Sequence, residues 1–458
     1  MSHRFDPVIL REYDVRGTVG TNLSDADAYA VGRSFATRLR RAGGTSVAVG
    51  YDGRTHSPAL EAALVRGLSE GGVDVVRVGL GPSPMLYYAA ATLGVDGGVQ
   101  VTGSHNPRDD NGFKLVLRGD SFFGDDITDL ARLAAAGDWT SGQGRVSERD
   151  VRADYVDRLL AGDPERGEGR PLRVGWDAGS GAAGEVVRAL TARLPGEHHL
   201  LFCEIDGNFP HHHPDPTVEA NLADLKALIA RERLDLGFAF DGDGDRIGAV
   251  DAAGRVLWGD EILALLAAPL LEELPGATIV ADVKSSDALF DRIAALGGKA
   301  LMWRTGHSEM KSKMKEVGAP LAGELSGHIF FAHGYYGFDD ALYAAVRLLR
   351  AVRRAGQPLA DLRAALPPRC TTPEWRVPVD EARKLAVVAE VAARLDAAAA
   401  RVDRTDGVRV SVDDGWWLLR ASNTQAALTL RAEARDEAGL ARLVAAIDAE
   451  LAASGVRR

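Results

Sequence analysis

The sequence predicts an α/β protein with four domains, three of them related to one another and the last of a different, α+β type. Three observations indicate this. A β-rich run ending in Asp, then Ser or Gly, then a helical repeat of apolar residues occurs within 47–69, 172–194 and 277–296. Residues 372–458 lack this pattern. A chain of 458 residues is also too long for a single hydrophobic core.

Each of the three units begins as a strand that leads into a helix. A second apolar run follows and ends in a polar loop that contains glycine: TGSHNP at 102–107, DGDGDR at 241–246 and GELSGH at 323–328. Strand–loop–helix units of this kind are common in α/β proteins. However, each repeat contributes one such loop after a strand, and ligands bind beyond the carboxyl ends of strands in open α/β sheets. We therefore expect three related domains that offer three loops to one central cleft.

The C-terminal region predicts an α+β domain. A strand is expected at 374–379, a helix at 381–400 and a strand pair around 413–415. The closing helix has apolar residues on one face, namely Leu440, Leu443, Val444, Ile447 and Leu451. This domain has its own polar loop, RASNTQ, at 420–425.

The expected domains are 1–150, 151–254, 255–366 and 372–458, with the serine, metal, sugar and phosphate loops in that order. We expect a hinge near Ala365 to Pro373, because Pro367-Pro368 separates a helix from a strand there.

Composition and charge restrict the function. A net charge of −11 argues against nucleic-acid binding, which requires a basic face. The longest uncharged apolar run, 262–271, is about half the length that a membrane helix needs. The N-terminus has acidic residues where a signal peptide is apolar, and two cysteines are too few for a disulfide framework. We expect a cytoplasmic protein with no nucleic-acid or membrane partner, whose small anionic substrate would need a locally positive cleft.

The DGDGDR loop predicts a metal site. Asp241, Asp243 and Asp245 alternate with glycines after an apolar strand at 236–240, so the three carboxylates can converge on a hard cation. An EF-hand loop is excluded, because its sixth and twelfth positions would be Arg246 and Ala252 in place of Gly and Glu. A solvated acidic turn is the other alternative. Three carboxylates and no soft ligand favour Mg²⁺.

Ser104 is the candidate carrier of a phosphoryl group. It follows an apolar run and precedes Asn106-Pro107, but it lacks the G-x-S-x-G frame of a hydrolase nucleophile. A phosphate on Ser104 would complete the coordination of the metal and face Arg246. The alternative is an ordinary turn serine that caps the next segment.

The RASNTQ loop is the candidate anion site. Arg420 can bind phosphate oxygens with two hydrogen bonds, and Ser422, Asn423 and Thr424 add further donors. Arg431, expected at the end of a strand at 427–430, would join them. The alternative is a polar hairpin without a ligand.

The GELSGH loop is the candidate sugar reader. Glu324 can accept two hydrogen bonds from neighbouring hydroxyls, Ser326 can donate or accept, and His328 adds an imidazole. A catalytic role for Glu324, as in glycosidases, is the alternative. Lys114 and His307 are candidates for moving protons, because histidine titrates near neutral pH. A loop histidine that is merely exposed is the alternative for His307.

Four motifs in this order resemble the α-D-phosphohexomutase family, specifically its phosphomannomutase/phosphoglucomutase branch. The resemblance covers nearly the whole chain and includes Tyr13-Asp-Val-Arg16-Gly and HHHPDPTVEANL at 211–222. It implies four domains around a deep central cleft, with the last domain related to TATA-box-binding-protein-like folds. The positions that match family residues in the cleft are Tyr13, Arg16, Lys114, Arg246, His307, Glu324, Ser326, His328 and the RASNT loop.

The resemblance also implies a reaction. Ser104 would be stored phosphorylated and would exchange its phosphoryl group with hexose 1- or 6-phosphates of mannose and glucose. Mg²⁺ would be held by the three aspartates and the phosphoserine, and hexose 1,6-bisphosphate would serve as intermediate or activator. A monomer or weak dimer is expected.

The chain departs from the family pattern at two places. Gln425-Ala426 stands where the family commonly has an acidic residue and proline, which puts the stiffness of that loop in doubt. His211 replaces an asparagine, so three consecutive histidines raise the alternative of a transition-metal site. TGSHNP with GELSGH favours glucose and mannose substrates over glucosamine. A phosphoglucosamine mutase, a metal-dependent sugar-phosphate phosphatase and a non-enzymatic sugar-phosphate sensor are the alternatives.

Overall fold

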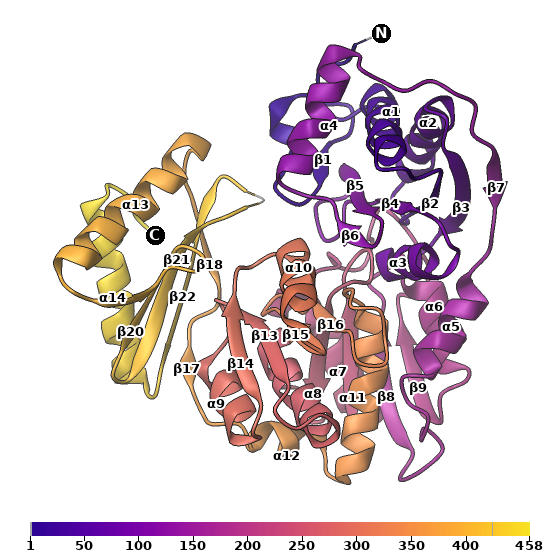
Figure 1. The fold of residues 1–458 in the computed structure, drawn as a ribbon. Coiled ribbons are helices and arrows are strands. Elements are labelled where there is room, and N and C mark those ends of the chain that lie inside the picture. The colour runs from indigo at the N-terminus through magenta and orange to yellow at the C-terminus, as the bar shows by residue number, and fades with distance from the viewer. Residues whose placement is uncertain (1, 424) are drawn as a thin grey trace.

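The computed structural model describes residues 2–423 and 425–458, and this part of the chain forms four β-sheets in succession (Figure 1). In the first sheet the strands follow the order β1-β5-β4-β2-β3-β7, and β6 pairs with β5. The strands are β1 (Val15–Thr18), β2 (Ser46–Tyr51), β3 (Asp74–Leu80), β4 (Gly97–Val101), β5 (Asp110–Leu117), β6 (Asp120–Ser121) and β7 (Val146–Glu148). The helices are α1 (Asp25–Arg41), α2 (Ser57–Glu70), α3 (Ser83–Thr92) and α4 (Asp125–Ala136), and α5 (Arg152–Leu160) leads into the next unit.

The second and third sheets follow the same plan. The second has the order β12-β11-β10-β8-β9 and the third β14-β13-β15-β16. The second unit contains β8 (Leu172–Asp177), α6 (Gly184–Thr191), β9 (Gly196–Leu201), α7 (Ala223–Glu232), β10 (Leu236–Phe240), β11 (Ile247–Asp251) and β12 (Val256–Leu257). The third contains α8 (Gly259–Glu273), β13 (Thr278–Asp282), α9 (Asp287–Ala295), β14 (Lys299–Trp303), α10 (His307–Val317), β15 (Leu321–Gly323), β16 (Ile329–Phe331), α11 (Ala341–Ala355) and α12 (Leu359–Ala364).

A shared four-strand motif confirms that the three units are related. β5-β4-β2-β3, β11-β10-β8-β9 and β16-β15-β13-β14 have the same order, with the outer strand antiparallel and the other three parallel. Each predicted loop lies at the same place in this motif, between the parallel strands β4, β10 and β15 and their antiparallel neighbours. The repeated sequence pattern therefore delivers three loops from equivalent positions.

The fourth sheet is antiparallel, and helices cover it on one side (Figure 1). Its order is β17-β22-β21-β20-β19, with β18 also paired to β22. The elements are β17 (Cys370–Thr371), β18 (Trp375–Pro378), α13 (Glu381–Ala397), β19 (Arg401–Asp403), β20 (Val408–Val412), β21 (Gly415–Ala421), β22 (Ala427–Ala434) and α14 (Glu437–Ala453). β22 runs beyond the expected 427–430, because its side chains stay buried and paired to β21 through Ala434.

The cores show how the units are joined. One apolar cluster runs through the second and third units and includes Tyr155 of α5 and Met85 of α3. The fourth unit has its own cluster, around Trp417 and Leu428. Only a small patch of buried apolar side chains in the described residues, Val283 with Trp416 and Leu418, connects the third sheet to the fourth. Within the described residues, we find no helix with the length and apolar character required to cross a membrane.

The start of α8 carries a buried acid that predicts pH-dependent stability. Glu261 accepts a hydrogen bond from the backbone N–H of Trp258 at 3.1 Å and pairs with Arg363 at 2.9 Å. Burial, followed by repulsion from Asp260, raises the pKa of Glu261 from 4.5 to about 7. The unfolded chain therefore loses this proton first, so stability falls as pH rises from about 4.5 through about 7 and is level above that.

We expect Glu261→Gln to remove this part of the pH dependence. An amide oxygen still accepts the N–H of Trp258, so the cap survives. Between about pH 6 and pH 8.5 the wild type should lose about 1 kcal/mol relative to the variant, as measured by urea unfolding. Equal slopes for the two proteins would show that Glu261 does not titrate in this range.

Candidate active site

The serine loop and the aspartate loop meet. The Oγ atom of Ser104 donates to Oδ2 of Asp241 at 2.8 Å, although the two residues are 137 positions apart. Both side chains are buried, with Ser104 2% exposed. The expected convergence of these two loops is therefore what the structure has, and Ser104 faces a cavity rather than the outer surface.

An arginine that sequence reasoning missed shapes the serine loop. Arg54, which is buried, donates to the carbonyls of Ser104 and Asn106 at 2.7 Å each and to that of Asp110 at 2.9 Å. Ser104 has φ 49°, in the left-handed region that non-glycine residues seldom adopt. The hydroxyl of Thr102 accepts its N–H at 2.8 Å, so neighbouring groups hold this conformation. A lone arginine after Asp52-Gly carries no sequence signal for this role.

Three buried carboxylates form the metal-site candidate. Asp241, Asp243 and Asp245 are 0% exposed and offer ligand atoms that all lie within 4.8 Å of one another. Oδ1 of Asp243 and Oδ1 of Asp245 have no hydrogen-bond partner among the described residues. Unpartnered buried carboxylate oxygens are costly unless a cation balances them. The donor set therefore fits a hard divalent cation.

Lys114 lies directly behind these aspartates. Its Nζ atom donates to Oδ2 of Asp243 at 2.7 Å and contacts Oδ2 of Asp245. Burial, then repulsion from Asp243, raises the pKa of Asp241 well above its usual range and that of Asp245 to about 6. Lys114 holds the pKa of Asp243 low, although burial opposes this. One lysine thus compensates only part of the acidic charge.

Arg246 connects the aspartates to two imidazoles. Its Nε donates to Nε2 of His328 at 2.7 Å, and its Nη1 lies 3.4 Å from Nε2 of His105. Burial, followed by the charge of Arg246, holds the pKa of each histidine well below its usual range. Both rings are therefore neutral near pH 7.

A second cluster combines Asp245 and His328 with Asp339. Cations already contact two of its members, because Arg246 donates to His328 and Lys311 donates to Asp339 at 2.9 Å. A metal there would compete with two fixed positive groups. The three aspartates of the DGDGDR loop remain the better metal candidate.

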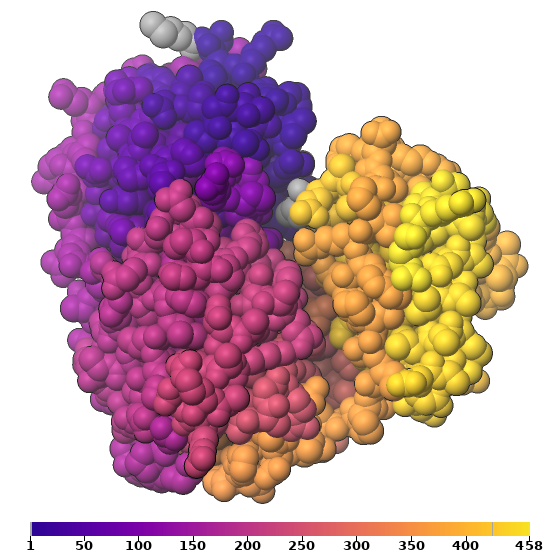
Figure 2. Space-filling model, turned by 180° about the vertical axis from the view of Figure 1, so that it is seen from behind, coloured from indigo at the N-terminus to yellow at the C-terminus, as the bar shows by residue number. Residues whose placement is uncertain are grey.

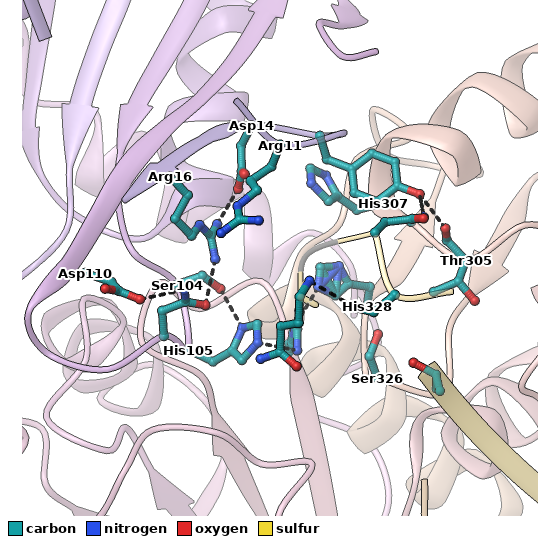
Figure 3. A pocket seen from close by; sticks show the side chains of 18 of the residues that line it. Arg11, Asp14, Arg16, Ser104, His105, Asp110, Thr305, His307, Ser326 and His328 are labelled. Atoms are coloured by element: carbon teal, nitrogen blue, oxygen red, sulfur yellow. Dashed lines mark hydrogen bonds and ion pairs between the residues drawn. The ribbon is translucent and has the colours of Figure 1, made fainter. Parts of the chain in front are cut away.

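The sugar loop stands on the opposite side of the cavity. Oε1 of Glu324 accepts the backbone N–H of Gly306 at 2.5 Å, and burial, then Asp282, raises the pKa of Glu324 to about 7. Ser326 and His328 also line the cavity. Figure 3 shows Ser104 and His105 on one side, with Ser326, His307 and His328 on the other.

The fourth domain closes the cavity through its polar loop. Nε of Arg420 pairs with Asp406 at 2.9 Å, whereas its Nη2 has no partner among the described residues. The side chain of Asn423 donates to the hydroxyl of Tyr13, which in turn donates to the carbonyl of Thr305 at 2.7 Å. This chain of contacts joins the first, third and fourth domains, and a hollow separates the fourth domain from the others on the surface (Figure 2).

The cavity has a volume of about 290 Å³ and is locally positive. Its described lining includes seven Lys and Arg side chains but four Asp and Glu: Arg11, Arg16, Lys114, Arg246, Lys284, Arg376 and Arg420 against Asp14, Asp110, Glu324 and Glu374. This local excess is what an anionic substrate needs against the net charge of −11. Lys284, Arg11 and Arg376 carry no motif that would have identified them.

Most of the sequence-predicted site residues line this cavity. They are Tyr13, Arg16, Ser104, Lys114, Arg246, His307, Glu324, Ser326, His328, Arg420, Ser422 and Asn423. Thr424 lies outside the described residues. Arg431 lies apart: it contacts Asp260 at 3.3 Å and the carbonyl of Lys284, because β22 continues past it and carries it away from the loop.

The three histidines at 211–213 point in different directions. His211 stacks on Phe202 with ring centroids 4.0 Å apart, and His212 pairs with Asp177 at 3.0 Å. His213 donates to the carbonyl of His105 at 2.5 Å. None belongs to the metal-capable groups found in the described part of the chain. Their contacts instead support the serine loop from below.

Comparison with known protein families identifies the chain. Four families of phosphoglucomutase/phosphomannomutase domains match in order: α/β/α domain I at 7–139, domain II at 153–254, domain III at 258–370 and the C-terminal domain at 374–450. The chain belongs to the phosphoglucomutase/phosphomannomutase family. This is an isomerase family, and the resemblance suggested by the four motifs is confirmed.

Relatives span the whole length of this family member. Phosphomannomutase/phosphoglucomutase from Pseudomonas putida is 44% identical, covering 95% of this chain and 93% of the relative. Phosphoglucomutase from Neisseria gonorrhoeae is 40% identical, covering 95% of each. A crystal structure of a phosphoglucomutase/phosphomannomutase family protein from Burkholderia thailandensis superimposes with a TM-score of 0.91 at 41% identity, covering 98% of both chains. The four-domain fold around a central cleft is therefore confirmed.

Proposed function

We propose that this chain catalyses reversible phosphoryl transfer between C1 and C6 of hexose phosphates of mannose and glucose, through phosphorylated Ser104 and a hexose 1,6-bisphosphate. The observation that carries this proposal is the contact of the Ser104 hydroxyl with Asp241 inside a positive cavity. A serine beside three unneutralised carboxylates is poorly suited to acyl transfer. It is well suited to carry a phosphoryl group that a divalent cation bridges to those carboxylates.

The transfer conserves atoms and charge. The free hydroxyl oxygen of the sugar forms a bond to phosphorus as the bond from phosphorus to Oγ of Ser104 breaks, and the hydroxyl proton passes to a base. In the reverse half, Oγ accepts the other phosphoryl group of the bisphosphate. Mg²⁺, held by Asp241, Asp243, Asp245 and the phosphoserine, would neutralise charge on the transferring group.

Fixed cations handle the remaining charge. Lys114 and Arg246 flank the aspartates and would contact oxygens of the transferring group. Arg16 donates to Oδ1 of Asn106 at 3.1 Å and to the carbonyl of Gly103 at 3.3 Å, so it is positioned over the serine loop. We assign it the same task from the opposite side.

The far end of the substrate would be held by the fourth domain. Arg420, with one unpartnered nitrogen, and the loop residues Ser422, Asn423 and Thr424 would bind the phosphate that does not react. Glu324 and Ser326 would read the sugar hydroxyls between the two phosphate positions. Because the substrate must be held by either end, we also propose that the fourth domain (372–458) moves about a hinge at 365–373 relative to 1–150, 151–254 and 255–366.

The proton acceptor has two candidates in the cavity. His307, favoured by the sequence, and His328 both line it. Burial, followed by the charge of Lys311, holds the pKa of His307 well below its usual range, as burial and Arg246 do for His328. Each ring is therefore neutral and has one nitrogen with a free electron pair. We place this enzyme in the cytoplasm, as a monomer or weak dimer.

Three sugar phosphates separate the possible activities. We expect glucose 1-phosphate and mannose 1-phosphate to be converted at rates within about tenfold of each other, because Glu324 and Ser326 read hydroxyls remote from C2. Glucosamine 1-phosphate should be converted much more slowly, since Leu325 lacks a polar group for its nitrogen. The rates are measured by coupled assay of the 6-phosphate products, with inorganic phosphate followed in parallel.

Two outcomes would favour the alternatives. A dominant glucosamine activity would identify a phosphoglucosamine mutase. Stoichiometric release of inorganic phosphate without 6-phosphate product would identify a phosphatase, in which water intercepts the phosphoserine.

A further inference from the structure

His307 is approached from behind by a lysine that lines a different cavity. Nζ of Lys311, one turn along α10, lies 3.3 Å from Nδ1 of His307 and donates to Oδ1 of Asp339 at 2.9 Å. It also lies over the ring of Tyr87, 4.7 Å from its centroid. Lys311 lines the apolar cavity between the first and third domains and does not line the active-site cavity. It therefore contacts His307 without access to substrate.

The contact fixes which ring nitrogen carries the proton. An ammonium group has three N–H donors and no acceptor, so Nδ1 of His307 must be the acceptor in this pair. Nδ1–H would place two donors face to face at 3.3 Å. Asp339 cannot take such a proton instead, because its Oδ2 is 3.8 Å from Nδ1 of His307, beyond hydrogen-bond distance.

The proton of neutral His307 then belongs on Nε2. Resting on the proposed function, we propose that Lys311 is a positioning residue that holds His307 in the Nε2–H tautomer, so that His307 donates a hydrogen bond to a phosphoryl or sugar oxygen and does not serve as the general base. This reverses the role that the sequence favoured for His307. The ion pair of Lys311 with buried Asp339 holds the ammonium in place.

The surroundings explain why a lysine is needed. Asp339 is 0% exposed, and its Oδ2 lies 3.3 Å from Nδ1 of His328. Without Lys311, the nearest strong partner of His307 Nδ1 would be this carboxylate, which attracts Nδ1–H and would leave Nε2 as a bare acceptor toward the cavity. An acceptor there would repel the oxygens of a phosphosugar. One ammonium group thus determines whether His307 attracts or repels the substrate.

The tautomer is directly measurable. Two-bond ¹H–¹⁵N correlation spectra of histidine-labelled full-length protein near pH 8 distinguish protonated from unprotonated ring nitrogens, and the spectrum of His307→Asn assigns the signals. We expect Nε2 of His307 to be protonated in the wild type. Lys311→Met, of similar length without donors, should shift His307 toward Nδ1–H. Lys311→Arg, which also only donates, should retain the wild-type tautomer.

Kinetics supply the second readout. Lys311→Met should raise KM for glucose 1-phosphate about tenfold, and Lys311→Arg should recover most of it. Lys313→Met is the matched control, because Lys313 on the same helix packs on Trp303 and pairs with Glu316 instead. It should leave both the tautomer and KM unchanged.

Either of two results would overturn the proposal: a wild-type spectrum with Nδ1 protonated, or an unchanged tautomer in Lys311→Met. The wild-type spectrum decides the matter even if a variant fails to fold. It is also independent of catalysis, so a protein without mutase activity would refute the proposed function while leaving the tautomer assignment standing.

Discussion

Replacing Ser104 by alanine is expected to lower mutase turnover at least about 10³-fold, because the variant has no oxygen to accept the phosphoryl group. The fold should survive. Arg54 and Thr102 hold the loop through backbone atoms of 104–110, and serine and alanine share the same Cβ, so the cost of φ 49° is unchanged. The coupled assay measures turnover, and intact-mass measurement should find one added phosphoryl group on the wild type but none on the variant.

The exposed serine Ser141 provides a matched control. Ser141→Ala removes a hydroxyl of the same chemistry far from the cavity and should leave both turnover and phosphoryl content unchanged. Full turnover by Ser104→Ala would show that the phosphoryl group passes directly between substrates, or through another residue.

Substitution of Asp241 by asparagine is expected to abolish the response to Mg²⁺ without destabilising the metal-free protein. Oδ1 of Asp241 accepts the N–H groups of Asp245 and Arg246 at 3.1 and 3.2 Å, which an amide oxygen also does. Burial and Asp243 make ionisation of Asp241 unfavourable, so removing this charge relieves repulsion. In the wild type, Mg²⁺ at about one hundred times its Kd should add about 2.7 kcal/mol of stability.

Thermal unfolding with a chelator and with excess Mg²⁺ measures this difference. Asp241→Asn should unfold at or above the wild-type temperature in chelator, should gain nothing from Mg²⁺, and should lose at least about 10³-fold in turnover. Asp448→Asn, at an exposed acid paired with Arg458 on the last helix, is the control and should behave as the wild type. A variant at Asp241 that keeps its Mg²⁺ response would place the metal elsewhere.

The sequence predicted the fold well where the chain signals itself locally. The apolar run at 236–240 is the strand β10 to the residue, and the repeated strand–helix openings correspond to β2, β8 and β13. Residues whose function depends on adjacent motifs, such as Ser104 and the three aspartates, could be found for the same reason. Glycine, serine and aspartate in a short loop after a strand restrict the possible chemistry.

The residues that escaped prediction act over long sequence separations. Arg54 binds carbonyls of 104–110, and Lys311 reaches Asp339, yet neither lies in a distinctive motif. Arg431 was expected near the phosphate loop, because nothing local indicates that β22 continues to Ala434. Strand ends depend on the partner strand, and here β21 determines how far the pairing extends.

The equivalent placement of the three loops has a consequence for how specificity changes in this architecture. Each loop bridges a parallel strand and its antiparallel neighbour, so its two ends are anchored by sheet hydrogen bonds that do not depend on the loop's own side chains. The segment 323–328 is thereby modular. Grafting the corresponding loop of a mutase with another sugar preference exchanges recognition chemistry while leaving the folding information of the sheet intact.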